Sequence, residues 1–121
     1  MYKAFTEIYT EAGEKIDDYE TSFGFRSAQF RLDGFYLNGK KILLDGSNVH
    51  QDHGGWADAV TDKGLERDVK YVKMCGFNFI RGSHYPHDQS FSAACDKNGI
   101  GLWAEGGLWS IGGFNDKILL I

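Results

Sequence analysis

Three short segments each look like the carboxyl end of a buried parallel strand, and each runs into polar residues. They are Gly46–His53, Ile80–Pro86 and Leu102–Gly107. In β/α barrels, ligand groups come from the carboxyl ends of successive strands, so residues far apart in the sequence meet at one site. The polar side chains that this pattern brings to one sheet edge are His50, Arg81, His84 and Glu105.

Helical periodicity separates these segments. Thr61 or Asp62 can cap a first helix that ends before Gly76, and Asp88 can cap a second helix that Gly99 terminates in a left-handed conformation. The apolar positions are Leu65, Val69 and Val72 in the first helix and Phe91, Ala94 and Cys95 in the second. The buried strands expected beside them are Phe77–Ile80 and Ile100–Trp103. Short connections between alternating strands and helices predict a parallel sheet.

Residues 1–34 have a different pattern. Their apolar residues mostly alternate with polar ones, as in half-buried antiparallel strands, and a polar turn lies around Gly13. The pair Asn38-Gly39 then lies between two apolar runs, which is a strong hairpin signal because both turn positions need positive φ. The second arm of this hairpin, Lys41–Asp45, runs on into Gly46. A domain junction is therefore expected near residues 34–40.

The same segments carry a family resemblance. DGFYLNGKKILLDGSNVHQDHGGW (33–56), GFNFIRGSHYPHD (76–88) and CDKNGIGLWAE (95–105) closely resemble glycoside hydrolase family 2, the beta-galactosidase and beta-glucuronidase family. The resemblance extends upstream through residues 9–30. It implies an α/β chain in which residues 1–34 are the C-terminal strands of an immunoglobulin-like β-sandwich domain. Residues 35–121 would then be the N-terminal part of a TIM-barrel catalytic domain, with its first three strands.

The resemblance also implies roles for individual residues. The histidines matching His50 and His84 line the sugar subsite and donate hydrogen bonds to ring hydroxyls, a task that suits a neutral imidazole. The alternative is that each one only satisfies a nearby carboxylate or carbonyl. Arg81 is expected to orient a catalytic carboxylate, or to form a structural salt bridge inside the barrel.

Two acidic residues complete the predicted substrate-binding set. Asp52 either reaches the sugar or holds its own loop. Glu105 ends the third strand, where it would be a perturbed carboxylate and a site candidate, but the resemblance does not make it the acid/base or the nucleophile. The candidate ligands for a metal ion are His50, Asp52, His53, His84, His87 and Asp88. Their spacing matches no zinc signature, so neither a metal nor another cofactor is expected.

The catalytic pair of the family is absent from this sequence. Retaining glycosidases need two carboxylates about 5 to 5.5 Å apart. In the family they are glutamates at later strands, the acid following an asparagine, and this chain has no Asn-Glu dipeptide. We therefore expect a fragment of a retaining, beta-galactosidase-like enzyme acting on terminal β-linked sugars, without catalytic residues of its own and inactive alone. The alternatives are a non-catalytic carbohydrate-binding or assembly module and an inactive truncated product.

Composition limits the partners. The net charge is −4, from 13 basic and 17 acidic residues without a basic run, which argues against nucleic acid. No apolar stretch approaches the roughly 20 residues that span a bilayer, so no membrane association is expected. Cys75 and Cys95 are predicted to be buried free thiols. The expected partners are a carbohydrate substrate and either the remainder of a parent enzyme or further copies of this chain.

Overall fold

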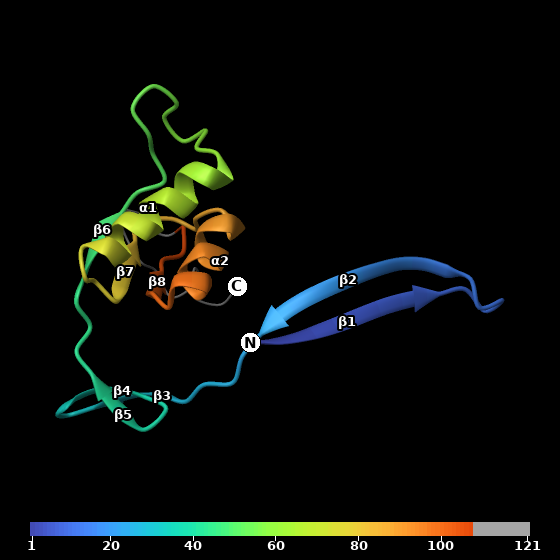
Figure 1. Cartoon of the computed structure of the whole chain (residues 1–121), viewed down its shortest axis with the longest axis horizontal. Helices are drawn as coiled ribbons and strands as arrows, with labels where there is room; N and C mark the ends of the chain where they lie inside the picture. The colour runs from blue at the N-terminus through green and yellow to red at the C-terminus, as the bar shows by residue number, and fades with distance from the viewer. Residues whose placement is uncertain (108–121) are drawn as a thin grey trace, which may run out of the picture. The chain divides into compact units, whose positions relative to one another are not determined.

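The computed structural model of this chain describes residues 1–107, which form eight strands and two helices in two compact units. The units divide between Leu43 and Leu44. The first unit contains β1 to β5, and the second contains β6 to β8 with helices α1 and α2 (Figure 1). None of the helices within residues 1–107 has the length and apolar character to cross a membrane.

A long hairpin opens the first unit. β1 (Tyr2–Tyr9) pairs antiparallel with β2 (Lys15–Phe23). The turn between them includes Gly13 at a φ of 83°, a left-handed conformation that glycine adopts without steric cost. Every residue of both strands is exposed, so the expected half-buried face is wrong for this hairpin. The alternation is present, but no other strand of the first unit covers its apolar side.

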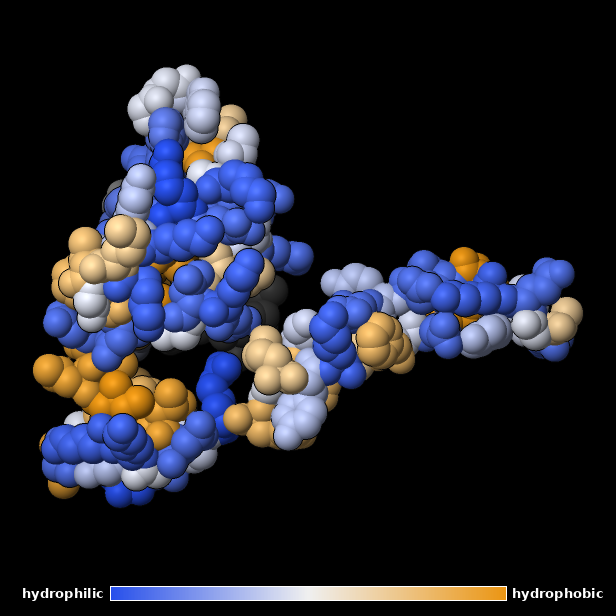
Figure 2. Space-filling model, viewed as in Figure 1, coloured by the Kyte–Doolittle hydropathy of each residue, from blue (hydrophilic) through white to orange (hydrophobic). Residues whose placement is uncertain are grey.

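A second antiparallel sheet completes the first unit. Its strands, in order, are β3 (Ala28–Arg31), β4 (Gly34–Leu37) and β5 (Lys40–Ile42). Asn38 and Gly39 join β4 to β5 with φ values of 51° and 78°, the positive values that a two-residue type I′ turn requires. The predicted hairpin is confirmed, although its second strand ends at Ile42 and does not continue to Asp45. Hydrophobic surface is exposed on both sheets (Figure 2). The domain boundary expected after residue 34 stays a prediction.

The second unit alternates strands and helices. In chain order these are β6 (Gly46–Val49), α1 (Asp62–Met74), β7 (Phe79–Gly82), α2 (Gln89–Asn98) and β8 (Gly101–Ala104). The three strands are parallel, with β7 in the middle. The predicted parallel sheet and both helices are confirmed. The strands β7 and β8 begin two residues and one residue later than expected.

The helix ends follow from local chemistry. Of the two candidate caps of α1, Thr61 is the one used, and its hydroxyl accepts a hydrogen bond from the Gly64 amide at 3.2 Å. Asp88 caps α2 by accepting from the Ser90 amide at 2.8 Å. Gly99 ends α2 at a φ of 64°. Each cap satisfies an amide or carbonyl that the helix leaves unpaired.

A small core joins the two helices to the sheet. It consists of Leu65, Val69, Ile80, Phe91, Ala94, Cys95 and Ile100. Both cysteines are free. Cys95 is buried as predicted, and burial raises the pKa of its thiol to about 11, with a further contribution from the Asp96 charge. Cys75 is exposed, which corrects the prediction, because it caps the carboxyl end of α1 where the chain leaves the core.

Candidate functional site

The parallel register aligns the carboxyl ends of the three strands. Val49 lies opposite Gly82, and Gly82 lies opposite Ala104. The next residues along the three strands therefore leave the sheet at the same edge. His50 follows β6, Ser83 and His84 follow β7, and Glu105 follows β8. This edge is where the sequence pattern predicted a site.

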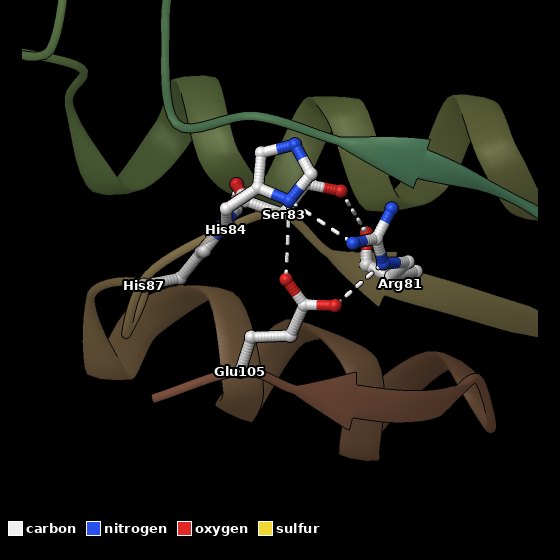
Figure 3. A network of polar contacts seen from close by, with 5 residues as sticks. All are labelled: Arg81, Ser83, His84, His87 and Glu105. Atoms are coloured by element: carbon white, nitrogen blue, oxygen red, sulfur yellow. Dashed lines mark hydrogen bonds and ion pairs between the residues drawn. The ribbon is translucent and has the colours of Figure 1, made fainter. Parts of the chain in front are cut away.

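Arg81, His84 and Glu105 form a polar network at this edge (Figure 3). Arg81 Nε lies 2.5 Å from Glu105 Oε1, and the side chain of Glu105 is 19% exposed. His84 Nδ1 lies 3.2 Å from Glu105 Oε2 and 3.0 Å from Arg81 Nη2. Arg81 therefore forms the structural salt bridge that was one of its two expected roles. Its contact with a catalytic carboxylate stays a prediction.

The charges in this network keep Glu105 ionised. The Arg81 guanidinium beside Glu105 holds the pKa of that carboxyl below its usual range; desolvation opposes this effect, and the hydrogen bond from His84 reinforces it. Nδ1 of His84 faces both residues, so it donates to Glu105 when it carries a hydrogen and accepts from Arg81 when it does not. Nε2 of His84 lies on the side of the ring away from Glu105 (Figure 3).

His50 joins the network through its ring. The His50 and His84 rings meet edge to face with centroids 5.1 Å apart, and Tyr85 lies 6.1 Å from His50. His50 is exposed, whereas His84 is 21% exposed. Four predicted residues therefore come together from three strand ends: His50, Arg81, His84 and Glu105. Their contact with a sugar stays a prediction.

The fifth predicted residue, Asp52, lies apart from this network. Its side chain is exposed and makes no hydrogen bond or ion pair with the described part of the chain, so it does not hold its loop. Backbone bonds do this instead, with the His53 amide donating to Ala57 at 3.0 Å and the Ala57 amide donating back at 2.9 Å. The role of Asp52 in substrate contact stays a prediction.

Three residues outside the predicted substrate-binding set hold the loops that carry it. They are Gln51, Tyr85 and His87. The Gln51 amide donates to the Tyr85 hydroxyl at 3.2 Å, and the Gln51 side-chain oxygen accepts from the Asp88 amide at 2.7 Å. His87 Nε2 lies 3.1 Å from the Ser83 carbonyl. The only sequence signal was the density of polar and aromatic residues in Ser83–Asp88, which does not specify these pairings.

An open hollow of about 340 Å³ lies beside the network and shares only Glu105 with it. Its lining residues are Gly82, Tyr85, Pro86, His87, Ser92, Leu102, Ala104, Glu105 and Gly106. Among residues 1–107, no three His, Cys, Asp or Glu side chains are grouped so as to hold a metal ion. The polar groups at this edge can exchange hydrogen bonds with hydroxyl groups.

The fold and the site define a class of protein. A parallel strand–helix–strand–helix–strand unit, with polar side chains just beyond the carboxyl ends of its strands, is the arrangement with which a β/α barrel begins. The family description "Glycosyl hydrolases family 2, TIM barrel domain" matches residues 29–118. The chain belongs to glycoside hydrolase family 2.

Individual relatives agree with this assignment. A beta-galactosidase from Thermoanaerobacterium thermosulfurigenes is 40% identical over 90 residues, covering 74% of this chain and 13% of the relative. The crystal structure of Parabacteroides merdae beta-glucuronidase superimposes on 86% of this chain and 13% of its own, with a TM-score of 0.79 and 36% identity. A Bacteroides uniformis beta-glucuronidase has a TM-score of 0.81, 37% identity and the same two coverages.

These comparisons confirm the predicted fold class, with β-sandwich strands followed by the first part of a parallel β/α barrel. They also show that this chain spans only about an eighth of the length of these relatives.

Proposed function

We propose that this chain is a segment of a longer retaining glycoside hydrolase and forms one wall of its sugar pocket. The observation that carries the proposal is the convergence of His50, Arg81, His84 and Glu105 at one sheet edge. Ligands of β/α barrels bind at this edge, and imidazole nitrogens exchange hydrogen bonds with hydroxyl groups. The expected substrate is a terminal β-linked sugar.

In this proposal, Glu105 orients its neighbours and does not react. A retaining enzyme needs a general acid with a raised pKa and a second carboxylate about 5 to 5.5 Å away. The pKa of Glu105 is instead lowered, mainly by Arg81. The other glutamate in the described part of the second unit, Glu66, lies on α1 and pairs with Lys63 at 3.1 Å. The chain alone should therefore not hydrolyse glycosides.

The sugar is proposed to be neutral, as in a beta-galactosidase. A glucuronide carries a carboxylate, which a guanidinium binds well. Arg81 contacts both Glu105 and His84, so its charge is already paired. The relatives include both beta-galactosidases and beta-glucuronidases, so nitrophenyl β-galactoside and β-glucuronide should be assayed side by side.

The test is His84→Ala in the complete enzyme that carries this segment. If His84 binds the sugar more strongly as positive charge develops, kcat/KM should fall by an amount equivalent to roughly 2–4 kcal/mol. The melting temperature should change little. The matched control is Thr61→Ala, which removes a helix cap away from the network and should lower stability by about 1 kcal/mol with kcat/KM unchanged.

Near-normal kcat/KM in His84→Ala would remove this residue from the sugar site. Sugar binding by calorimetry without any hydrolysis in the complete protein would support the alternative, a non-catalytic carbohydrate-binding module.

A further inference from the structure

The His87 ring is held in a defined orientation behind His84. Nε2 of His87 lies 3.1 Å from the Ser83 carbonyl oxygen, and because a carbonyl only accepts, Nε2 must carry the hydrogen. Nδ1 is buried and has no hydrogen-bond partner within residues 1–107. The ring stacks on Tyr85 with centroids 5.3 Å apart and packs on Phe91 at 4.6 Å. These contacts leave the ring few other orientations.

Ser83 connects His87 to the site. This residue is fully buried, and its amide donates to the Val49 carbonyl at 3.0 Å. Its carbonyl, which accepts from His87, belongs to the peptide that joins Ser83 to His84 (Figure 3). The backbone just before His84 is therefore fixed on one side by the end of β6 and on the other by His87.

The far side of the same loop is fixed as well. Gln51, the residue after His50, contacts both Tyr85 and the Asp88 amide. The loop after β6 and the loop after β7 are therefore joined directly. Gln51 and Ser83 are the chain neighbours of His50 and His84, whose rings lie 5.1 Å apart.

We propose that His87 is a positioning residue, which in its Nε2–H tautomer holds the Ser83 carbonyl and so sets the direction of His84. The part of this inference that concerns sugar rests on the proposed function. The hydrogen bond and its effect on the His84 ring do not, and they can be tested separately.

Three substitutions isolate the hydrogen bond. Gln places an amide nitrogen near the position of Nε2, so His87→Gln should keep the donor. Asn places its amide near the position of Nδ1, so His87→Asn should lose the bond with a similar change in polarity. Phe keeps an aromatic ring against Tyr85 and Phe91 but has no donor. If His87→Phe fails to fold, the comparison of His87→Gln with His87→Asn still shows whether the hydrogen-bond donor matters.

The first readout uses the 121-residue chain labelled with ¹⁵N-histidine, at concentrations where it is monomeric. It has four histidines, and two-bond ¹H–¹⁵N spectra distinguish their tautomers. We expect an Nε2–H tautomer for His87, and His84 ring signals that shift in His87→Asn and His87→Phe but stay in place in His87→Gln. An Nδ1–H tautomer of His87, or equal His84 shifts in all three variants, would overturn the proposal.

The second readout is kcat/KM for an aryl β-glycoside in the complete enzyme. His87→Asn and His87→Phe should lose roughly 10- to 100-fold, the range for a catalytic site displaced by up to about 1 Å, and His87→Gln should stay within about threefold. Val69→Ala, which destabilises the core elsewhere, controls for stability and should also stay within about threefold. Equal kcat/KM in Gln and Asn variants would contradict the proposal. An unsubstituted enzyme that hydrolyses no glycoside would refute the proposed function, while the His87 inference would still be tested by the spectra.

Discussion

The two units of this chain obtain their structure in different ways. In the first unit, β1, β2 and β3 are exposed at every residue, and their pairing follows from turn chemistry and alternation. In the second unit, two capped helices and a parallel sheet enclose a core in which Val69, Ile80 and Phe91 are fully buried. Turn residues are thus enough to define which strands pair. The paired strands of the first unit, however, bury little of the apolar surface that stabilises a fold.

The location of the candidate site follows the same division. His50, Arg81, His84 and Glu105 all lie in the unit that has a core. A rigid scaffold is what holds a binding geometry in place, and the first unit by itself has no comparable support among the described residues. We therefore expect stability and site geometry to respond to changes in the second unit far more than to changes in the first.

The largest expected contrast is between two phenylalanines. Phe91→Ala empties a fully buried position and should lower the free energy of unfolding by about 3–5 kcal/mol. Phe5→Ala, at a position 71% exposed, should change it by less than about 0.5 kcal/mol. Denaturant unfolding of both variants measures the difference. Equal losses would mean that the first unit contributes as much to stability as the second.

Local signals in the sequence predicted the elements well. The cap at Asp88, the stop at Gly99 and the turn at Asn38-Gly39 each depend on the conformation of one or two residues. Such choices can be read from residue type. The parallel order of β6, β7 and β8 followed from their short helical connections, and with it the convergence at the sheet edge.

Burial and side-chain pairing were harder to predict. The alternation of β1 and β2 indicated one covered face, but what covers a face depends on other elements. Cys75 follows a helical pattern and is nonetheless exposed at the end of α1. The choice of Glu105 as the partner of Arg81, and of Ser83 as the partner of His87, depends on geometry across strand ends that no spacing rule specifies.

A thiol reagent should distinguish the two cysteines. At pH 8, we expect exposed Cys75 to react at once and Cys95 to react only as the second unit opens, because burial raises the pKa of Cys95 to about 11 from 9.0. Because burial disfavours the thiolate, Cys95 should not reduce stability below pH 9, and the free energy of unfolding should fall as the pH rises from 9 through 11. The loss should be missing in Cys95→Ala. Equal labelling rates for both thiols in the folded chain would contradict this assignment.

The smallest expected effect is self-association of the chain through the first unit. Tyr2, Tyr19 and Phe23 lie on one face of the hairpin, 59%, 69% and 38% exposed, and exposed apolar strands favour pairing between chains. We expect light scattering to show oligomers that grow with concentration and that Tyr19→Lys reduces. Ser22→Lys, on the opposite face, is the matched control. A chain that stays monomeric at all concentrations would contradict this prediction.

The most direct test of the account is hydrolysis of nitrophenyl β-galactoside by the purified 121-residue chain. The site holds Glu105 as an ionised partner of Arg81, and the described residues place no second glutamate beside it. We therefore predict no release of nitrophenol above the protein-free background. Turnover that survives repurification and disappears in Glu105→Gln would contradict the account, because Glu105 would then be a catalytic residue in an active site of a different kind.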